Sequence, residues 1–466
     1  MTSTTSRLLW IVAIVLLGST SAVATADGPR PAACTSTLPP TPPPLTATTV
    51  DTIGQAYFCI ADHYVDGAGS TLFAGAFAGL TQELHRRGID TATATMPALT
   101  GDPDADWSAF RERYQAVVAP LPAALRQPLA EAALRGLLAA PHDNHILWQR
   151  PVLPPGAQPG QSYGLGFDTT PSAASVTATP ASAVPPLFVT RVLGGPAARA
   201  GLRPGDVVTA VDGSAPFAGG EPSPGVIRAL TQQYPRQDTV RVTLRRPVTG
   251  RVWTVSLRPE LYQPDPAATR QVTSRVLAGQ VGYVALRGFG GGAADQVRQA
   301  VADLGRLTGV VLDLRGNHGG SPLEVARLLA AFVHGRTWSY DCATGYTDCR
   351  PNTTDDTQPL LGLPVVVLTD RECASACDAF AGAVHDLGIG PVVGTRTAGI
   401  VSGAATAYLL DDGSVLGLPD RHQLGADREI INGIGVAPDH DVPTTAGDLS
   451  AGRDPAVALA ATVLTQ

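Results

Sequence analysis

The chain has 466 residues, with 33 basic and 40 acidic side chains and a formal net charge of −7, which argues against binding nucleic acid through bulk charge. Charged residues make up 16% of the chain, and 50 glycines and 40 prolines fit a loop-rich globular protein of about two or three domains. No lysine occurs anywhere in the sequence, and its absence excludes Schiff-base catalysis, a P-loop lysine and a Ser-Lys dyad.

Residues 1–26 have the features of a secretory signal peptide. Arg7 precedes an uninterrupted apolar run over 8–17, and Ala24-Thr25-Ala26 is a small-residue cleavage site. The run is shorter than the roughly 20 residues that span a bilayer, so we expect cleavage, with an uncleaved membrane anchor as the alternative. The mature protein is expected to be secreted or extracytoplasmic, without stable insertion in a membrane.

The cysteines are even in number, as expected for disulfides in an oxidising compartment. We favour pairing between neighbours along the chain, although a disulfide across a single helical turn is a demanding geometry for the last pair. The pairs are Cys34 with Cys59, Cys342 with Cys349, and Cys373 with Cys377. A zinc site is the alternative, but no Cys-x-x-Cys pair or matching histidine spacing supports it, so we predict no metal and no cofactor.

Two segments precede the first β-rich region. Residues 27–49 are rich in Pro, Thr and Ala and are predicted to form an extended linker. Residues 50–150 show apolar positions such as Ile53, Tyr57 and Ile60 at three- and four-residue spacing, which predicts a helical subdomain.

Residues 161–260 carry four motifs in a fixed order. Gly164-Leu165-Gly166-Phe167 is followed by a β-like run over 187–192, a small-residue segment over 197–202 and Arg203-Pro204-Gly205-Asp206 before a further strand. In this order the motifs resemble a PDZ domain. The resemblance implies that the N–H groups of Gly164, Leu165, Gly166 and Phe167 hold a peptide carboxylate while the peptide adds to a sheet edge. A helix over 225–234 is predicted beside that groove.

Residues 270–462 alternate between strands and helices. Buried strands are predicted over 281–286, 310–314 and 364–369, and helices over 293–307, 322–333 and 379–387. The chain as a whole is therefore expected to be an α+β / α/β multidomain protein with an α/β core.

Ser375 lies among small residues between a buried strand and a helix. Such a serine exposes its Oγ, and the N–H groups at the helix start can stabilise an oxyanion. The loop 316–320 follows a neighbouring strand, and its glycines allow close approach to the same point. The alternative is that Ser375 is simply a helix N-cap.

Further motifs in the core resemble one family of serine peptidases. They include Asp313-Leu314-Arg315-Gly316-Asn317, Ala374-Ser375-Ala376-Cys377-Asp378, Gly394-Thr395-Arg396-Thr397-Ala398-Gly399 and Gly435-Val436-Ala437-Pro438-Asp439. Together with the helical and PDZ-like regions they resemble the C-terminal processing peptidases and the tricorn core protease. The resemblance implies a crotonase-like ββα spiral core, Ser375 as the nucleophile, and the N–H groups of Gly320 and Ala376 as oxyanion donors.

The general base distinguishes two branches of this family. C-terminal processing peptidases use a lysine at the position that Ile400 occupies here. The tricorn-like branch uses a histidine before the PDZ region, and its pattern matches Asp143-Asn144-His145. We therefore predict His145 as the base, with His142 and His318 as weaker candidates.

A third residue normally orients the imidazole. In the tricorn-like branch a glutamate does so indirectly, and Asn432 stands at the matching position. Asparagine can orient a ring but adds no negative charge. Asn432 and Asn144 are thus candidate catalytic residues, and Glu429 or Asp143 could substitute for the missing glutamate.

These features predict a secreted serine endopeptidase that acts on proteins or peptides and uses a PDZ domain to engage substrate C-termini. The alternative is a catalytically silent relative that binds peptides outside the cytoplasm. A cysteine nucleophile, Cys373 or Cys377, is a third option that expected oxidation disfavours. The sequence does not define an oligomeric state.

Overall fold

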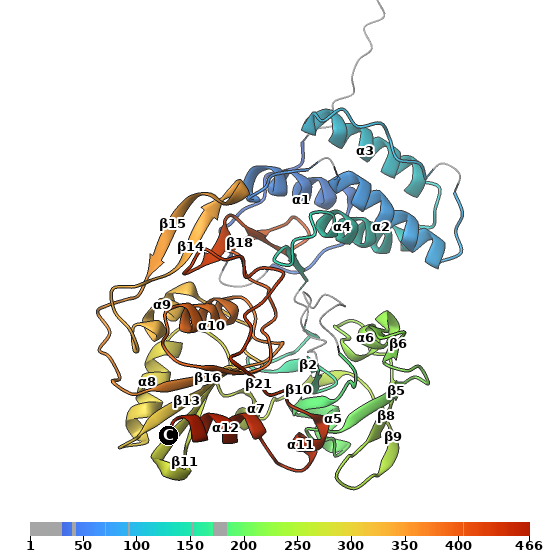
Figure 1. The fold of residues 1–466 in the computed structure, drawn as a ribbon. Helices are drawn as coiled ribbons and strands as arrows, with labels where there is room; N and C mark the ends of the chain where they lie inside the picture. The colour runs from blue at the N-terminus through green and yellow to red at the C-terminus, as the bar shows by residue number, and fades with distance from the viewer. Residues whose placement is uncertain are drawn as a thin grey trace, which may run out of the picture.

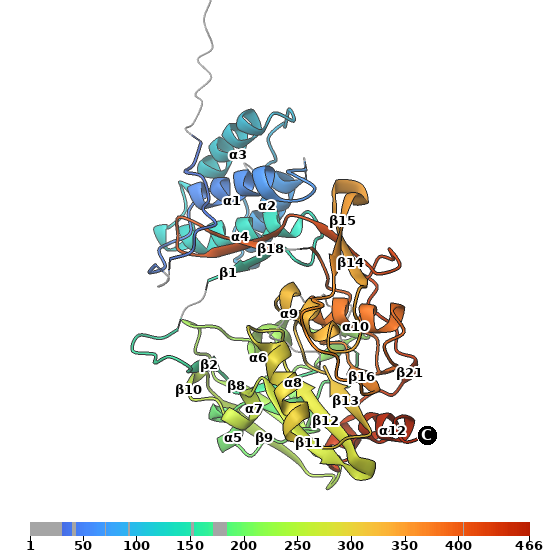
Figure 2. The ribbon, with the colours of Figure 1, turned by 90° about the vertical axis from the view of Figure 1, so that its left-hand side faces the viewer.

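The computed structural model describes residues 30–39, 43–69, 71–91, 94–150, 153–170, 184–403 and 405–466. The predicted signal peptide over 1–26 lies outside these residues. Within the described ranges no helix combines the length and apolar character needed to cross a membrane. Figures 1 and 2 show a helical part at one end of the molecule, with a β-rich part and an α/β part side by side at the other.

The helical part shares its core with strands from the C-terminal half of the chain. Its elements are α1 (Val50–His63), α2 (Leu72–Arg86), α3 (Pro103–Val118), η1 (Ala123–Leu125) and α4 (Arg126–Ala139). Their apolar faces pack around Trp107 and Phe110, as the helical spacing predicts, but Leu416 and Leu418 belong to the same core. Those two residues lie in β19 (Val415–Pro419), which pairs with β18 (Ala405–Leu409). The packing thus joins regions that are distant in sequence.

The proline-rich segment before α1 is extended but fixed against the body. Thr49 caps α1 by accepting hydrogen bonds from the first-turn N–H groups. The backbone N–H of Thr46 donates to the Asp412 carbonyl at 3.0 Å, and the Thr48 hydroxyl donates to the Asp412 carboxylate at 2.7 Å. The described part of this linker is therefore docked rather than free.

The β-rich part has its own apolar core around Leu165, Val189 and Val242. Its elements are β2 (Ser162–Gly164), β3 (Phe167–Thr169), β4 (Val189–Val192), α5 (Gly195–Arg199), β5 (Val207–Val211), β6 (Phe217–Ala218), β7 (Glu221–Pro222), α6 (Pro224–Leu230), β8 (Val240–Arg245), β9 (Val252–Leu257) and β10 (Glu260–Tyr262). The helix predicted over 225–234 ends four residues early at Leu230. Thr231 already leaves the helical path, with a φ of −105° and a ψ of +33°.

The α/β part is built on a six-stranded sheet. Its order is β11 (Val272–Leu277), β12 (Val281–Leu286), β13 (Gly309–Asp313), β16 (Val365–Thr369), β17 (Val392–Gly394) and β21 (His440–Asp441). All neighbouring pairs except β11–β12 are parallel. Val310 and Leu312 pack against helices on one face, whereas Val311 packs toward the other face. Burial on both faces explains the continuous apolar runs in the sequence.

Helices cover both faces of this sheet. On one face lie α8 (Ala293–Asp303), α9 (Pro322–Leu329) and α10 (Ala376–Asp386), and on the other lies α12 (Pro455–Val463). The helix predicted over 293–307 stops at Asp303, before Gly305, whose φ of +77° ends the helical path. The helix predicted from 379 begins at Ala376 instead.

The remaining elements complete the connections around the sheet. They are β1 (Leu147–Gln149), α7 (Pro266–Thr269), η3 (Ala278–Gln280), β14 (Thr337–Ala343), η4 (Thr344–Tyr346), β15 (Thr347–Thr353), β20 (His422–Gly425) and α11 (Ala446–Ser450). Strand β14 pairs with both β15 and β20.

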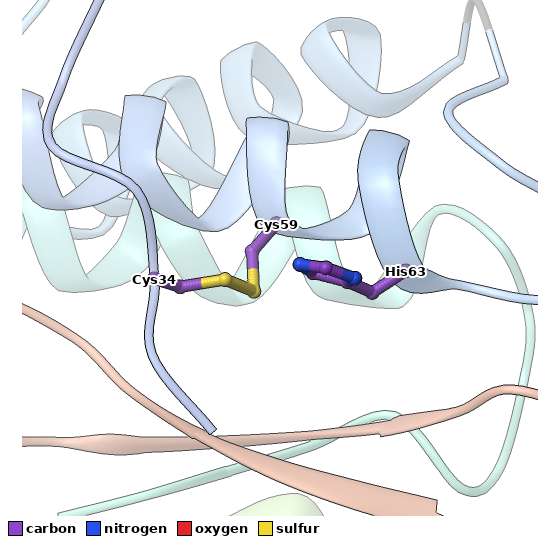
Figure 3. A group of neighbouring side chains, drawn as sticks. All are labelled: Cys34, Cys59 and His63. Atoms are coloured by element: carbon purple, nitrogen blue, oxygen red, sulfur yellow. A yellow bond between two sulfur atoms is a disulfide. The ribbon is translucent and has the colours of Figure 1, made fainter. Parts of the chain in front are cut away.

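All six cysteines form disulfides between neighbours along the chain. The expectation that a helical turn disfavours the last pair is wrong, because Cys373 precedes α10 and only Cys377 is helical, which leaves a Cα–Cα distance of 5.1 Å. Within the described residues, one group of potential metal ligands is close together, namely Cys34, Cys59 and His63. Figure 3 shows that both thiols are consumed in a disulfide beside the His63 ring.

Candidate active site

Ser375 occupies a sharp turn between β16 and α10. Its φ of +60° and ψ of −121° are unusual for a residue with a side chain. Its backbone N–H donates to the Ile400 carbonyl at 2.6 Å and to the Asp378 carboxylate at 3.0 Å. The turn is thus held at its amide while the serine side chain faces a pocket.

Asp378 joins this turn to the segment before β18. Besides the Ser375 N–H, its carboxylate accepts the N–H groups of Gly399 at 2.9 Å and Ile400 at 3.0 Å. Burial raises the pKa of Asp378 to about 6, although these hydrogen bonds favour the ionised form. The sequence motif includes Asp378, but only the structure shows that its carboxylate connects the Ser375 turn to Gly399 and Ile400.

The glycine loop after β13 contacts the serine turn directly. Gly319 has a φ of +93°, and a Cβ at this position would lie 2.7 Å from the Ser375 Cβ and 2.9 Å from the Ala376 nitrogen. Asn317 shapes the loop, since its Nδ2 donates to the Leu286 carbonyl and its Oδ1 accepts the Gly319 N–H. Only glycine allows this approach.

Gly320 and Ala376 line the same pocket as Ser375. Ala376 is the first residue of α10, and N–H groups in a first helical turn have no partner within the helix. The helix N-terminus also favours negative charge. This placement is compatible with the prediction that the N–H groups of Gly320 and Ala376 stabilise an oxyanion.

His145 lines this pocket as well, although 230 residues separate it from Ser375 in the sequence. The pocket has a volume of about 210 Å³ and also includes Trp338. His145 is placed there by β1, which follows it and pairs antiparallel with β19, so that Leu147 lies opposite Gly417. Strand pairing thus brings the predicted base and nucleophile to one cavity.

Hydrogen bonds around Asn144 define the tautomer of His145. Asn144 Nδ2 donates to the Gly399 carbonyl at 3.2 Å and to Asn432 Oδ1 at 3.0 Å. Its Oδ1 must therefore accept, and it lies 2.9 Å from His145 Nδ1. The ring proton is assigned to Nδ1, which leaves the lone pair on Nε2. That atom is buried and has no hydrogen-bond partner among the described residues.

The environment of His145 favours its neutral form. Burial lowers the pKa of the imidazole, and the negative charge of Asp143 opposes this effect. Asp143 does not orient the ring, because its carboxylate accepts the His145 backbone N–H at 2.7 Å and the Tyr64 hydroxyl at 2.9 Å. A neutral imidazole with a lone pair on Nε2 is the form that can accept a proton.

The alternative residues lie elsewhere. His318 faces Glu372 at 3.7 Å, and neither His318 nor His142 lines the Ser375 pocket. Glu429 neighbours Asp386, and burial raises its pKa to about 7. Cys373 and Cys377 form a disulfide and so offer no thiol nucleophile.

The predicted peptide-binding loop packs at the edge of the β-rich part. The Gly166 carbonyl accepts the N–H groups of Leu193 and Gly194. In the described residues β3 pairs with β4, and Asp168 and Thr169 in β3 are buried. A larger cavity of about 1150 Å³, bordered by Arg191 and Glu372, lies between the β-rich part and the α/β part. No sequence motif predicted this cavity.

Comparisons with known proteins agree with this architecture. Residues 280–442 match the model of peptidase family S41, and residues 188–246 match the model of the PDZ domain. Carboxyl-terminal-processing peptidase 2 of Arabidopsis thaliana is 29% identical over 296 residues, covering 62% of this chain and 54% of the relative. Tricorn protease homolog 1 of Streptomyces coelicolor is 29% identical over 279 residues, covering 56% of this chain and 24% of the relative.

The fold is also similar to that of a solved protease. The photosystem II D1 C-terminal processing protease superposes with a TM-score of 0.53 at 23% identity, over 90% of this chain and 98% of that one. The chain spans about half the length of the curated processing peptidases that it matches.

Proposed function

We propose that this chain is a serine endopeptidase in which Ser375 is the nucleophile and His145 the general base, from the premise that residues 280–442 match peptidase family S41 and residues 188–246 match the PDZ domain. The observation that carries the proposal is the shared pocket of Ser375 and His145, combined with the unpartnered lone pair on His145 Nε2. Asn144 and Asn432 orient the ring.

The chemistry follows from these positions. Ser375 Oγ attacks the carbonyl carbon of the substrate while His145 Nε2 takes the hydroxyl proton. The N–H groups of Gly320 and Ala376 stabilise the oxyanion of the tetrahedral intermediate. His145 then donates the proton to the leaving amine, and an acyl-enzyme remains on Ser375. Water deprotonated by His145 hydrolyses this ester and restores the serine.

The rest of the chain serves this reaction. We propose a helical subdomain over 50–150, a PDZ domain over 161–260 and a catalytic core over 270–462. In the PDZ domain the loop from Gly164 to Phe167 engages the C-terminus of a protein or peptide. The three disulfides support action outside the cytoplasm after removal of a signal peptide.

A fluorophosphonate probe tests the proposal. The wild-type chain should be labelled, and both Ser375→Ala and His145→Gln should abolish labelling without changing the circular dichroism spectrum. Cleavage of a fluorescent casein should disappear in the same variants. A folded wild-type chain that is neither labelled nor able to cleave casein would instead favour a silent peptide-binding protein.

A further inference from the structure

The serine turn contains a covalent link that the proposed chemistry does not use. Cys373 and Cys377 form a disulfide across a sequence separation of 4, and Ser375 is the residue midway between them. Both cysteines are fully buried, whereas the serine lines the pocket. The disulfide therefore closes a small covalent ring that includes the proposed nucleophile.

The two ends of this ring are attached to different parts of the core. The Cys373 N–H donates to the Asp370 carbonyl at 3.1 Å, and the Cys373 carbonyl accepts the Ala398 N–H at 2.9 Å. Cys377 lies in the first turn of α10, with its Sγ 3.7 Å from the Leu314 carbonyl just beyond β13. The link thus fixes the start of the helix relative to the loops that follow two neighbouring strands.

The backbone of Ser375 needs such support. Its φ of +60° costs a residue with a side chain about 1–3 kcal/mol, and such a conformation persists only where the surroundings impose it. Asp378 and Ile400 hold the Ser375 N–H from one side. The disulfide restrains the residues on both sides of the serine, so it limits the rotation that would relax the turn.

We propose that the Cys373–Cys377 disulfide positions Ser375 for catalysis, so that the turnover rate depends on the oxidised state of this pair. The inference rests on the proposed role of Ser375. A dithiol reductant would break the S–S bond by supplying two electrons and two protons, and would itself become a disulfide while two cysteine thiols form. The turn could then relax and displace the serine Oγ from His145 Nε2.

The expected effect is on turnover rather than on substrate binding. A displacement of about 1 Å between reacting groups can cost about 100-fold in rate. Neither cysteine lines the pocket, and lining residues outside the turn, such as Trp338 and Gln423, are not covalently linked to this disulfide. We expect kcat to fall by about 10- to 100-fold while KM changes by less than about twofold.

The experiment compares two full-length double variants, Cys373→Ala/Cys377→Ala and Cys342→Ala/Cys349→Ala. The second variant is a matched control, because it removes a disulfide of the β14–β15 hairpin whose two cysteines do not line the pocket. For each, kcat and KM on fluorescent casein and the rate of fluorophosphonate labelling are measured. A large loss of kcat and labelling rate in the first variant alone supports the proposal. Equal kcat values in wild type and both folded variants overturn it.

A second measurement uses the unmodified chain, in case the first variant does not fold. Wild-type protein is treated with dithiothreitol, the new thiols are alkylated and located by mass spectrometry, and near-UV circular dichroism monitors tertiary structure. Labelling that declines in step with reduction of Cys373–Cys377 and returns on reoxidation supports the proposal, and labelling that survives this reduction overturns it. If the wild type is never labelled, the proposed function fails instead of this inference.

Discussion

The substitution Asn432→Asp tests whether residue 432 acts on the imidazole through Asn144. Asn432 Oδ1 accepts hydrogen bonds from Asn144 Nδ2 at 3.0 Å and from the Val401 N–H at 3.3 Å. An aspartate of the same shape would keep both bonds and add a negative charge. We expect this charge to favour the protonated form of His145.

The size of the effect follows from the chain of contacts. Asn144 Oδ1 lies 2.9 Å from His145 Nδ1, so with normal amide geometry the new charge would lie within about 8 Å of the ring. At an effective dielectric constant of about 20, two unit charges at about 8 Å attract by about 2 kcal/mol, which corresponds to about 1.5 pKa units. Desolvation of the new carboxylate offsets part of this gain. We therefore expect kcat to rise about tenfold.

The pH dependence gives the second signature. A protonated His145 cannot act as a base, so activity falls as the pH drops through its pKa. In the wild type, burial holds this pKa below the ordinary value of about 6.5, and the acid limb should lie at correspondingly low pH. Asn432→Asp should move this limb upward by about one unit.

The assay is kcat/KM on fluorescent casein measured from pH 4.5 to 9, with kcat determined at saturating substrate. Gln296→Glu is the control, because it adds the same charge at an exposed position on α8. This control should leave both kcat and the acid limb unchanged. An unmoved limb and an unchanged kcat in Asn432→Asp would refute the view that residue 432 acts on the ring.

Three further substitutions test the supports of the site. Gly319→Ala places a Cβ 2.7 Å from that of Ser375, so the rate of fluorophosphonate labelling should fall at least about 100-fold in a folded protein. A labelling rate within twofold of wild type would contradict the close approach of residue 319 to the serine turn. Tyr64→Phe removes the hydrogen bond to Asp143, and urea unfolding should show a loss of about 1 kcal/mol, whereas no loss would show that the bond is not stabilising. Asp378→Asn turns an amide NH₂ toward backbone N–H donors, and a buried unpaired donor costs about 1–3 kcal/mol. The melting temperature should therefore fall, and an unchanged melting temperature would show that the Asp378 carboxylate does not stabilise the Ser375 turn.

The parallel core could be predicted because its strands are buried on both faces. The run over 281–286 has no charged residue, and the structure places β12 at those bounds. Helix ends were less well predicted, since they depend on particular backbone angles. The start of α10 at Ala376 follows from the positive φ of Ser375, and nothing in the local sequence marks that angle.

Contacts between distant segments could not be derived from local patterns. The periodicity of the N-terminal helices predicts an apolar face, but it does not reveal that Leu416 and Leu418 complete their core. The pairing of β1 with β19 is equally invisible, because three-residue strands carry almost no periodic signal. The placement of His145 depends on this pairing, so its prediction came from family resemblance alone.

The position of Ile400 shows how the site can dispense with a lysine. Its carbonyl accepts the Ser375 N–H and its own N–H donates to Asp378, so the backbone of residue 400 still supports the serine turn. The aliphatic side chain, however, cannot accept a proton. His145 lines the same pocket but belongs to a different segment. Asn144 connects the two segments, because its Nδ2 donates to the Gly399 carbonyl and its Oδ1 holds the His145 ring. Of the side chains at positions 145 and 400, only the His145 imidazole can accept a proton, as the proposed mechanism requires.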